Sequence, residues 1–208
     1  ARSCILFLLV DVYDVHNWQM SNIYWDQGDG AMRFDLNTSP VQPWKNGGGT
    51  TQELAVGYSG DALLWRLSMA QILADGPYSV FPGLQRIQTI VEGAGLHLSG
   101  PDQMIAVRPL HPVAFDGAVS FDAALRDGPC QALNLMFDPA RVQADVTVLF
   151  GPQCWSGIDE TLLYCARGSV RCGAETLAQE VGIHCTGPVD IDVSPGAVAV
   201  LATLKPVR

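Results

Sequence analysis

Alternation between hydrophobic and polar residues dominates the pattern of this chain. The run from Trp65 to Ala70 alternates strictly, so its large apolar side chains face one side of a predicted strand. Arg66 and Ser68 face the other side.

A second run, Arg86–Val91, alternates less regularly and ends at Glu92-Gly93-Ala94-Gly95, after which Leu96–Leu98 returns to the strand pattern. This order predicts a strand, a glycine turn and a second strand. Helix signals are weak, and 123–126 and 174–181 are each predicted to form at most a turn or two. Further strands are predicted at 104–107, 113–115, 131–137, 145–150, 162–166, 170–172, 189–193 and 197–204.

The strand–turn–strand pattern occurs twice. The stretch Thr89–Leu98 is echoed by Leu163–Cys172, and each is followed by a polar turn and an apolar run with proline nearby. Two short β units with the same plan predict two stacked jelly-roll halves.

Composition supports an all-β protein. The 208 residues are 48% hydrophobic and only 16% charged, with 21 glycines and 13 prolines, so a core can form and turns are frequent. The net charge of −9 argues against nucleic acid and anionic membranes as partners, because both require a basic surface. An anionic small molecule remains compatible if a few cations gather in one pocket.

The N-terminal part looks different from the rest. Residues 1–32 are interpreted as a leader, partly appended sequence, with an extra edge strand at Ile5–Tyr13 as the alternative. No apolar run reaches the roughly 20 residues of a membrane-spanning helix, and we expect a cytoplasmic protein. The six cysteines lack a C-x-x-C pair or a compact framework, so free and mostly buried thiols are expected.

The block from Pro43 to Leu54 contains three successive glycines, which cost backbone entropy on folding and permit positive φ. A polar loop for a small ligand is one interpretation, and a hairpin turn with solvated neighbours is the alternative. A phosphate loop is disfavoured because Lys45 precedes the glycines and strand-like sequence follows them.

Four blocks together resemble the HutD/Ves family, and the resemblance runs from about Arg33 to the C-terminus. They are Pro43–Leu54, Trp65–Ala70, Asp75–Arg86 and Val91–Leu96. The later half is less similar: Ala132 stands where the family tends to have aspartate. The resemblance implies a bicupin, with two jelly-roll (RmlC-like) β-barrels at 33–137 and 138–208. It also implies a link to bacterial histidine utilisation, with binding of a pathway metabolite and no established reaction.

Typical metal cupins carry two histidines and a glutamate on one strand, followed by a later histidine. The corresponding window here holds Ser79-Val80-Phe81 and then Arg86. Arginine does not deprotonate, so it repels a cation and attracts an anion. The four histidines are scattered and the cysteines lack zinc spacing, so we expect no metal and no cofactor.

Three of only 12 basic residues, Lys45, Arg66 and Arg86, lie in the matched blocks. A guanidinium fork from Arg66 is predicted to hold a carboxylate, with Lys45 as a second charge. The full predicted ligand site is Lys45, Asn46, Gly47, Thr50, Glu53, Arg66, Ser68, Phe81 and Arg86. The alternative for Arg66 and Arg86 is a structural ion pair, for instance with Glu53 or Glu92.

Three functions follow from these residues. The first is binding of a small anionic metabolite, such as urocanate or a formylated or formimino glutamate. The second is a metal-free enzyme on such a metabolite, with Glu53 as general acid or base and Lys45 or Arg66 stabilising negative charge. The third is a protein-interaction or regulatory module that uses the glycine loop. A homodimer is compatible with the predicted sheet edges.

Overall fold

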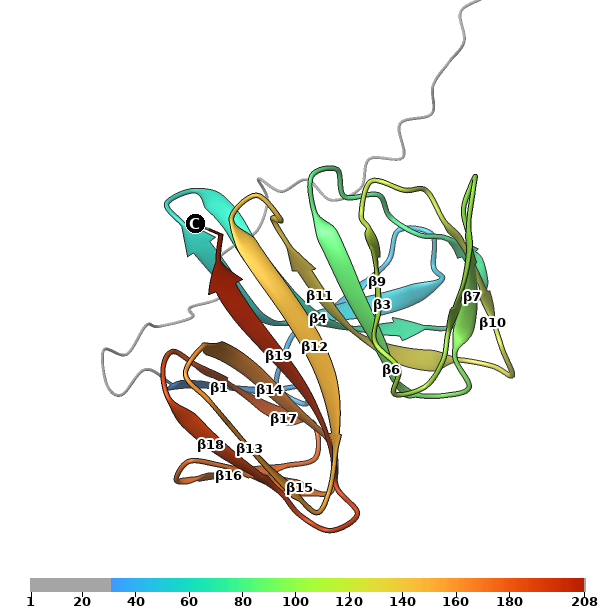
Figure 1. The fold of residues 1–208 in the computed structure, drawn as a ribbon. Helices are drawn as coiled ribbons and strands as arrows, with labels where there is room; N and C mark the ends of the chain where they lie inside the picture. The colour runs from blue at the N-terminus through green and yellow to red at the C-terminus, as the bar shows by residue number, and fades with distance from the viewer. Residues whose placement is uncertain (1–30, 208) are drawn as a thin grey trace, which may run out of the picture.

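The computed structural model describes residues 31–207, which form 19 strands in four sheets (Figure 1). The described residues contain no α-helix, so none of them forms a helix that could span a membrane. The all-β prediction is confirmed. Most of the predicted leader, including the alternative strand Ile5–Tyr13, lies outside the described residues.

The first unit consists of a six-stranded sheet, β2-β3-β4-β11-β6-β9, and a four-stranded sheet, β5-β10-β7-β8. Its strands are β2 (Val41–Pro43), β3 (Gly49–Ser59), β4 (Ala62–Ile72), β5 (Gly76–Pro77), β6 (Gln85–Glu92), β7 (Leu96–Ser99), β8 (Met104–Val107), β9 (Val113–Asp116), β10 (Asp122–Leu125) and β11 (Cys130–Phe137).

The second unit consists of a five-stranded sheet, β1-β17-β14-β19-β12, and a four-stranded sheet, β13-β18-β15-β16. Its strands are β1 (Ala31–Asp35), β12 (Val142–Phe150), β13 (Gln153–Gly157), β14 (Glu160–Arg167), β15 (Ser169–Cys172), β16 (Glu175–Ala178), β17 (Val181–Cys185), β18 (Val189–Val193) and β19 (Val198–Pro206).

The two units repeat one strand order. The first unit contains the rows β4-β11-β6-β9 and β5-β10-β7-β8, and adding eight to each number gives β12-β19-β14-β17 and β13-β18-β15-β16 of the second. Each unit therefore contains eight antiparallel strands in two sheets with the same order. The echo seen in the sequence falls on equivalent parts, β6–β7 and β14–β15.

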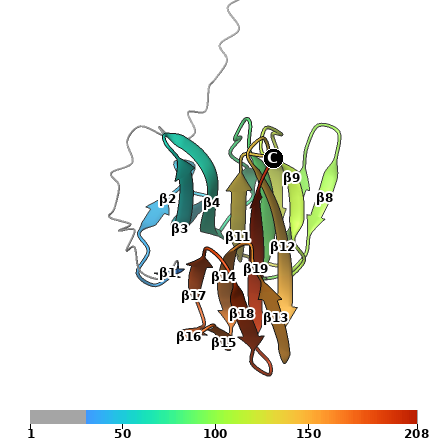
Figure 2. The same ribbon diagram turned by 60° about the vertical axis from the view of Figure 1, so that its left-hand side comes forward.

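The two large sheets pack face to face, and β11, β12 and β19 lie side by side in both ribbon views (Figure 1, Figure 2). One hydrophobic cluster fills this layer, with Trp65 and Leu67 from β4 against Tyr164 of β14. A polar contact crosses it, because Trp65 Nε1 donates to Glu160 Oε1 at 3.0 Å. His184 Nε2 lies 2.9 Å from the same oxygen.

The opposite face of each large sheet packs on the small sheet of its own unit. The cluster inside the second unit includes Leu163, Cys165 and Leu201, and the buried Thr161 lies on the same face of β14 as Leu163. The cluster inside the first unit is centred on residues such as Ile90, Leu98 and Phe121. The remaining inner face of the first unit carries polar side chains.

Two parts of the sequence prediction differ from the structure. The segments at 123–126 and 174–181 overlap the strands β10 and β16, so the predicted helical turns are wrong. Ala123 and Leu177 are buried in the cores of their units, and this packing overrides weak helix propensity. The strand β1 pairs with β17, so it lies in the second unit although residues 33–137 were assigned to the first.

Candidate functional site

Six polar residues gather on the inner face of the six-stranded sheet. We call them the inner cluster: Glu53, Arg66, Ser68, Arg86, Gln88 and Asn134. Strand register produces the gathering, because Ser68 is paired with Glu53 on one side and with Asn134 on the other, and Asn134 is paired with Gln88. Arg66 lies two residues from Ser68 on β4, and Arg86 lies two residues from Gln88 on β6. Both arginines therefore point to the same face of the sheet as those residues.

Arg86 lies in the buried part of the inner cluster and is only 6% exposed. Its NH2 group donates to Asn134 Oδ1 at 3.1 Å. The guanidinium carbon lies 5.2 Å from the ring centre of Tyr78, 5.6 Å from that of Phe81 and 5.1 Å from that of Phe115. These separations lie within the range of cation–π attraction, so three rings fix the position of the cation.

Gln88 is fully buried beside Arg86, at 0% exposure. Its Nε2 donates to Tyr78 Oη at 3.2 Å and to Asn134 Oδ1 at 3.1 Å, while its Oε1 has no hydrogen-bond partner among the described residues. A buried acceptor without a donor is destabilising, by about 1–3 kcal/mol. Burial raises the pKa of Tyr78 to about 12, so this phenol stays neutral at physiological pH.

Arg66 forms the partly exposed end of the inner cluster. Its Nε donates to Glu53 Oε2 at 2.7 Å, and the two side chains are 15% and 24% exposed. The structural ion pair considered in the sequence analysis therefore exists for Arg66. Its NH1 group donates to Ser68 Oγ at 3.5 Å, so Arg66 also contacts the hydroxyl of the inner cluster.

The second unit provides an internal comparison. The strand pair β14–β19 is equivalent to β6–β11, and Leu163 paired with Leu201 stands where the first unit has Gln88 paired with Asn134. Both leucines are buried. The same topology is therefore compatible with an apolar interior, so the fold itself does not require the polar residues of the first unit.

The glycine block forms the turn between β2 and β3. Trp44 N donates to Gly49 O at 2.9 Å, Gly47 N donates to Trp44 O at 3.0 Å, and Gly47 has a φ of 72°. A Cβ on Gly49 would collide with the carbonyl oxygen of Gln71 and lie 3.0 Å from the Trp44 ring. The hairpin therefore accounts for Gly47 and Gly49, as the alternative interpretation stated.

This turn lies far from the inner cluster. Gly49 pairs with Ile72, which is four residues from Ser68 on β4, or about 13 Å along a strand, and six residues from Arg66, or about 20 Å. Lys45, Asn46 and Gly47 are exposed at that end. Thr50 pairs with Gln71 on the opposite face of the sheet.

Five of the nine predicted site residues therefore come together, and four do not. Those that do are Glu53, Arg66, Ser68, Phe81 and Arg86; those that do not are Lys45, Asn46, Gly47 and Thr50. Sequence reasoning missed Gln88, Asn134, Tyr78 and Phe115. Gln88 carried a signal, since it lies two residues from Arg86 and so shares its face, and Tyr78 lies within the matched block Asp75–Arg86.

The inner cluster does not fit a divalent metal. Guanidinium groups repel cations, and amides and a hydroxyl make a poor set of ligands for a transition metal. Across residues 31–207, no three His, Cys, Asp or Glu side chains converge as possible metal ligands. His111 is exposed, with Nδ1 2.8 Å from the carbonyl oxygen of Pro109.

Comparison with known proteins gives consistent matches. The HutD family model matches residues 36–198. An uncharacterized 21.2 kDa protein in the hutC 3′ region of Pseudomonas putida is 35% identical over 152 residues, which cover 70% of this chain and 79% of that protein. Protein Ves of Citrobacter koseri is 30% identical over 152 residues, 72% of this chain and 80% of that protein. The structure of HutD from Pseudomonas fluorescens SBW25 (formate condition) has a TM-score of 0.75 and 27% identity, and covers 86% of this chain and 100% of that chain.

Proposed function

The chain belongs to the HutD family, and we propose that it is a bicupin that binds a small carboxylate metabolite at the inner cluster of its first unit. The strand order that both units share supports a jelly roll of the cupin type in each, and we assign one barrel to each. The first barrel binds the ligand, and the second, with its apolar interior, supports the first through the layer between the large sheets.

One observation carries this proposal: two buried amides, Gln88 and Asn134, stand where the equivalent strand pair of the second unit has leucines, and a buried arginine lies beside them. Burial of charged and polar groups is costly, and an apolar alternative exists in the same chain. Polar residues that oppose stability in this way are typical of functional sites.

The inner cluster also defines the shape of its ligand. The partly exposed guanidinium of Arg66 and the buried one of Arg86 attract an anion such as a carboxylate. The free acceptor Oε1 of Gln88 requires an N–H or O–H donor on the ligand. The rings around Arg86 give an apolar wall for a planar group.

A planar carboxylate with an N–H group has these features. Urocanate offers a carboxylate and an imidazole, and formylglutamate offers carboxylates and an amide. The relative in Pseudomonas putida lies in the hutC 3′ region, which favours an intermediate of histidine utilisation. We propose that binding of such an intermediate modulates this pathway.

A thermal-shift titration tests the proposal. A ligand that binds only the native state stabilises it by about 2.7 kcal/mol at a concentration of 100 Kd. For a chain of this size, each kcal/mol of stabilisation raises the Tm by about 2–4 °C. We expect a saturable rise in Tm with urocanate or formylglutamate and none with imidazole or ammonium. The control is Arg171→Gln, which removes an exposed arginine of the second unit and should leave the response unchanged. If none of these carboxylates raises the Tm, the proposal is wrong.

A further inference from the structure

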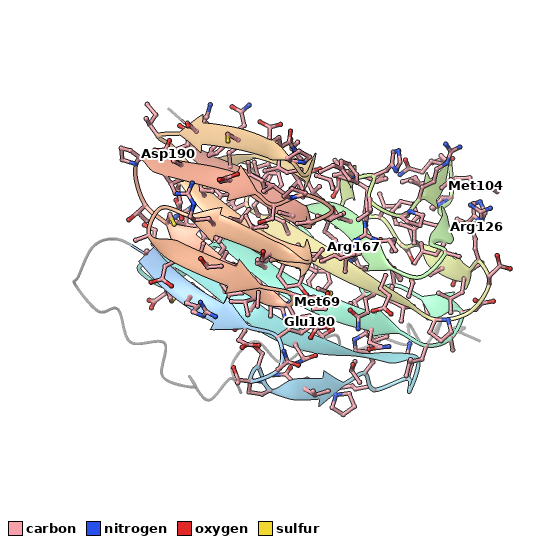
Figure 3. The ribbon with its side chains drawn as sticks, turned by 90° about the horizontal axis from the view of Figure 1, so that it is seen from below. Met69, Met104, Arg126, Arg167, Glu180 and Asp190 are labelled. Carbon is pink, nitrogen blue, oxygen red and sulfur yellow. The ribbon has the colours of Figure 1, made fainter. Side chains whose placement is uncertain are left out.

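A groove of about 230 Å³ lies at the junction of the two units, outside the inner cluster. Its lining includes Val91 and Glu92 from the end of β6, Ala166 and Arg167 from the end of β14, and Leu110 and Gln179 from loops. Figure 3 shows Arg167 between the far end of the first unit, marked by Met104 and Arg126, and that of the second, marked by Asp190. The volume suits a compact molecule rather than a polymer.

The groove is built from equivalent parts of the two units. Leu110 N donates to Ile90 O at 2.8 Å, and Glu180 N donates to Cys165 O at 2.8 Å. Leu110 and Glu180 both have positive φ, 60° and 68°. The acceptor residues, Ile90 and Cys165, each lie two positions before a charged residue at the end of the strand. Glu92 and Arg167 therefore occupy equivalent positions in the two units.

These equivalent positions carry opposite charges. Both side chains line the groove, yet among the described residues neither Glu92 nor Arg167 forms an ion pair, with the other or with any third residue. Both are followed by glycines with positive φ, Gly93 at 93° and Gly168 at 77°. The tight turns at these glycines fix the backbone from which the two charged side chains project.

Apart from the two charges, the lining combines the polar Gln179 with apolar side chains. Val91 and Ala166 are partly buried beside Glu92 and Arg167, and Leu110 adds a third apolar side chain. A ligand that complements this arrangement has a carboxylate for Arg167, an ammonium group for Glu92 and a small apolar body.

We propose that the groove between the units binds a free amino acid with an apolar side chain. The carboxylate forms a fork-like contact with the Arg167 guanidinium, and the ammonium group contacts the Glu92 carboxylate. The site is separate from the inner cluster and joins residues of both units. Its occupant therefore bridges the ends of β6 and β14.

L-Leucine is the probe for the test, titrated into the ¹⁵N-labelled full chain and followed by NMR. We expect saturable shifts of the amide signals of Glu92 and Arg167. The analogues 4-methylpentanoate and 3-methylbutylamine each lack one charge, and each should bind at least about tenfold more weakly, since tenfold corresponds to loss of one modest charge-assisted contact.

Variants give the sharper test. Arg167→Gln and Glu92→Gln should each weaken leucine binding about tenfold, whereas the double exchange Glu92→Arg with Arg167→Glu should restore it to within about threefold, with the ligand reversed. Arg126→Gln, at the far end of the first unit, is the matched control. Gln88→Leu in the inner cluster should leave leucine binding unchanged. Absence of saturable shifts, or single variants that bind leucine as the parent does, would overturn the proposal.

Discussion

We expect the substitution Gln88→Leu to raise the free energy of unfolding of the ligand-free protein and to remove its carboxylate affinity. The structure supplies three contributions. Loss of an unpaired buried acceptor is favourable by about 1–3 kcal/mol, because Oε1 of Gln88 has no partner. Loss of the two Nε2 hydrogen bonds, to Tyr78 and Asn134, is unfavourable by about 0.5–1.5 kcal/mol each.

These two contributions nearly cancel, so the added apolar burial decides the sign. A leucine at this fully buried position contributes about 1–2 kcal/mol more than the partly polar glutamine. Leu163 shows that the equivalent site of the second unit accommodates this side chain. The net expectation is an increase of about 1–2 kcal/mol.

Urea unfolding followed by tryptophan fluorescence measures this change. An unaltered m-value would show that unfolding exposes the same amount of surface in the parent and in the variant. Asn134→Leu is the contrasting variant, because it removes the acceptor of the Arg86 NH2 group and should lower the free energy of unfolding by about 1–3 kcal/mol. A decrease of more than 1 kcal/mol for Gln88→Leu would refute the reasoning, since Oε1 would then be satisfied in the free protein.

Three further predictions follow from the fold. Gly49→Ala should lower the free energy of unfolding by at least about 1–3 kcal/mol in urea, because its Cβ collides with neighbouring backbone; Gly48→Ala, which meets only a side chain at 3.3 Å, should cost less. Glu160→Ala leaves the buried indole of Trp65 without its acceptor and should cost about 1–3 kcal/mol, visible as a lower urea midpoint. Burial raises the pKa of Tyr78 from 10.0 to about 12, so its contribution to stability is present below pH 10 and lost as pH rises through 12, a change of about 2–3 kcal/mol. Tyr78→Phe should therefore lose less stability than the parent between pH 10 and 12.

The alternation of apolar and polar residues predicted most of the strands. Trp65–Ala70 and Arg86–Val91 lie within β4 and β6, two central strands of the six-stranded sheet. Their residues alternate because one face of this sheet packs on the other large sheet and the opposite face lies inside the first unit. Segments whose burial depends on distant partners were missed or misassigned. Ala123 is buried against the core of the first unit, and no local pattern predicts that contact.

The candidate site was predictable only in part. Arg66 and Ser68 were recognisable from one strand, whereas Asn134 joins the inner cluster through pairing between β4, β11 and β6, which a single sequence does not reveal. The glycine block drew attention because three glycines are costly. The hairpin geometry accounts for glycine at positions 47 and 49.

The most direct test of the central claim is isothermal titration calorimetry of urocanate and of formylglutamate against the parent, Gln88→Leu and Arg171→Gln proteins. Our account predicts that at least one of the two binds the parent and Arg171→Gln proteins equally. The Gln88→Leu protein should be folded and at least as stable as the parent. It should bind the ligand at least about tenfold more weakly, because the acceptor oxygen Oε1 is missing. Equal affinity for all three proteins, or no heat of binding to the parent, would contradict the assignment of the inner cluster as the ligand site.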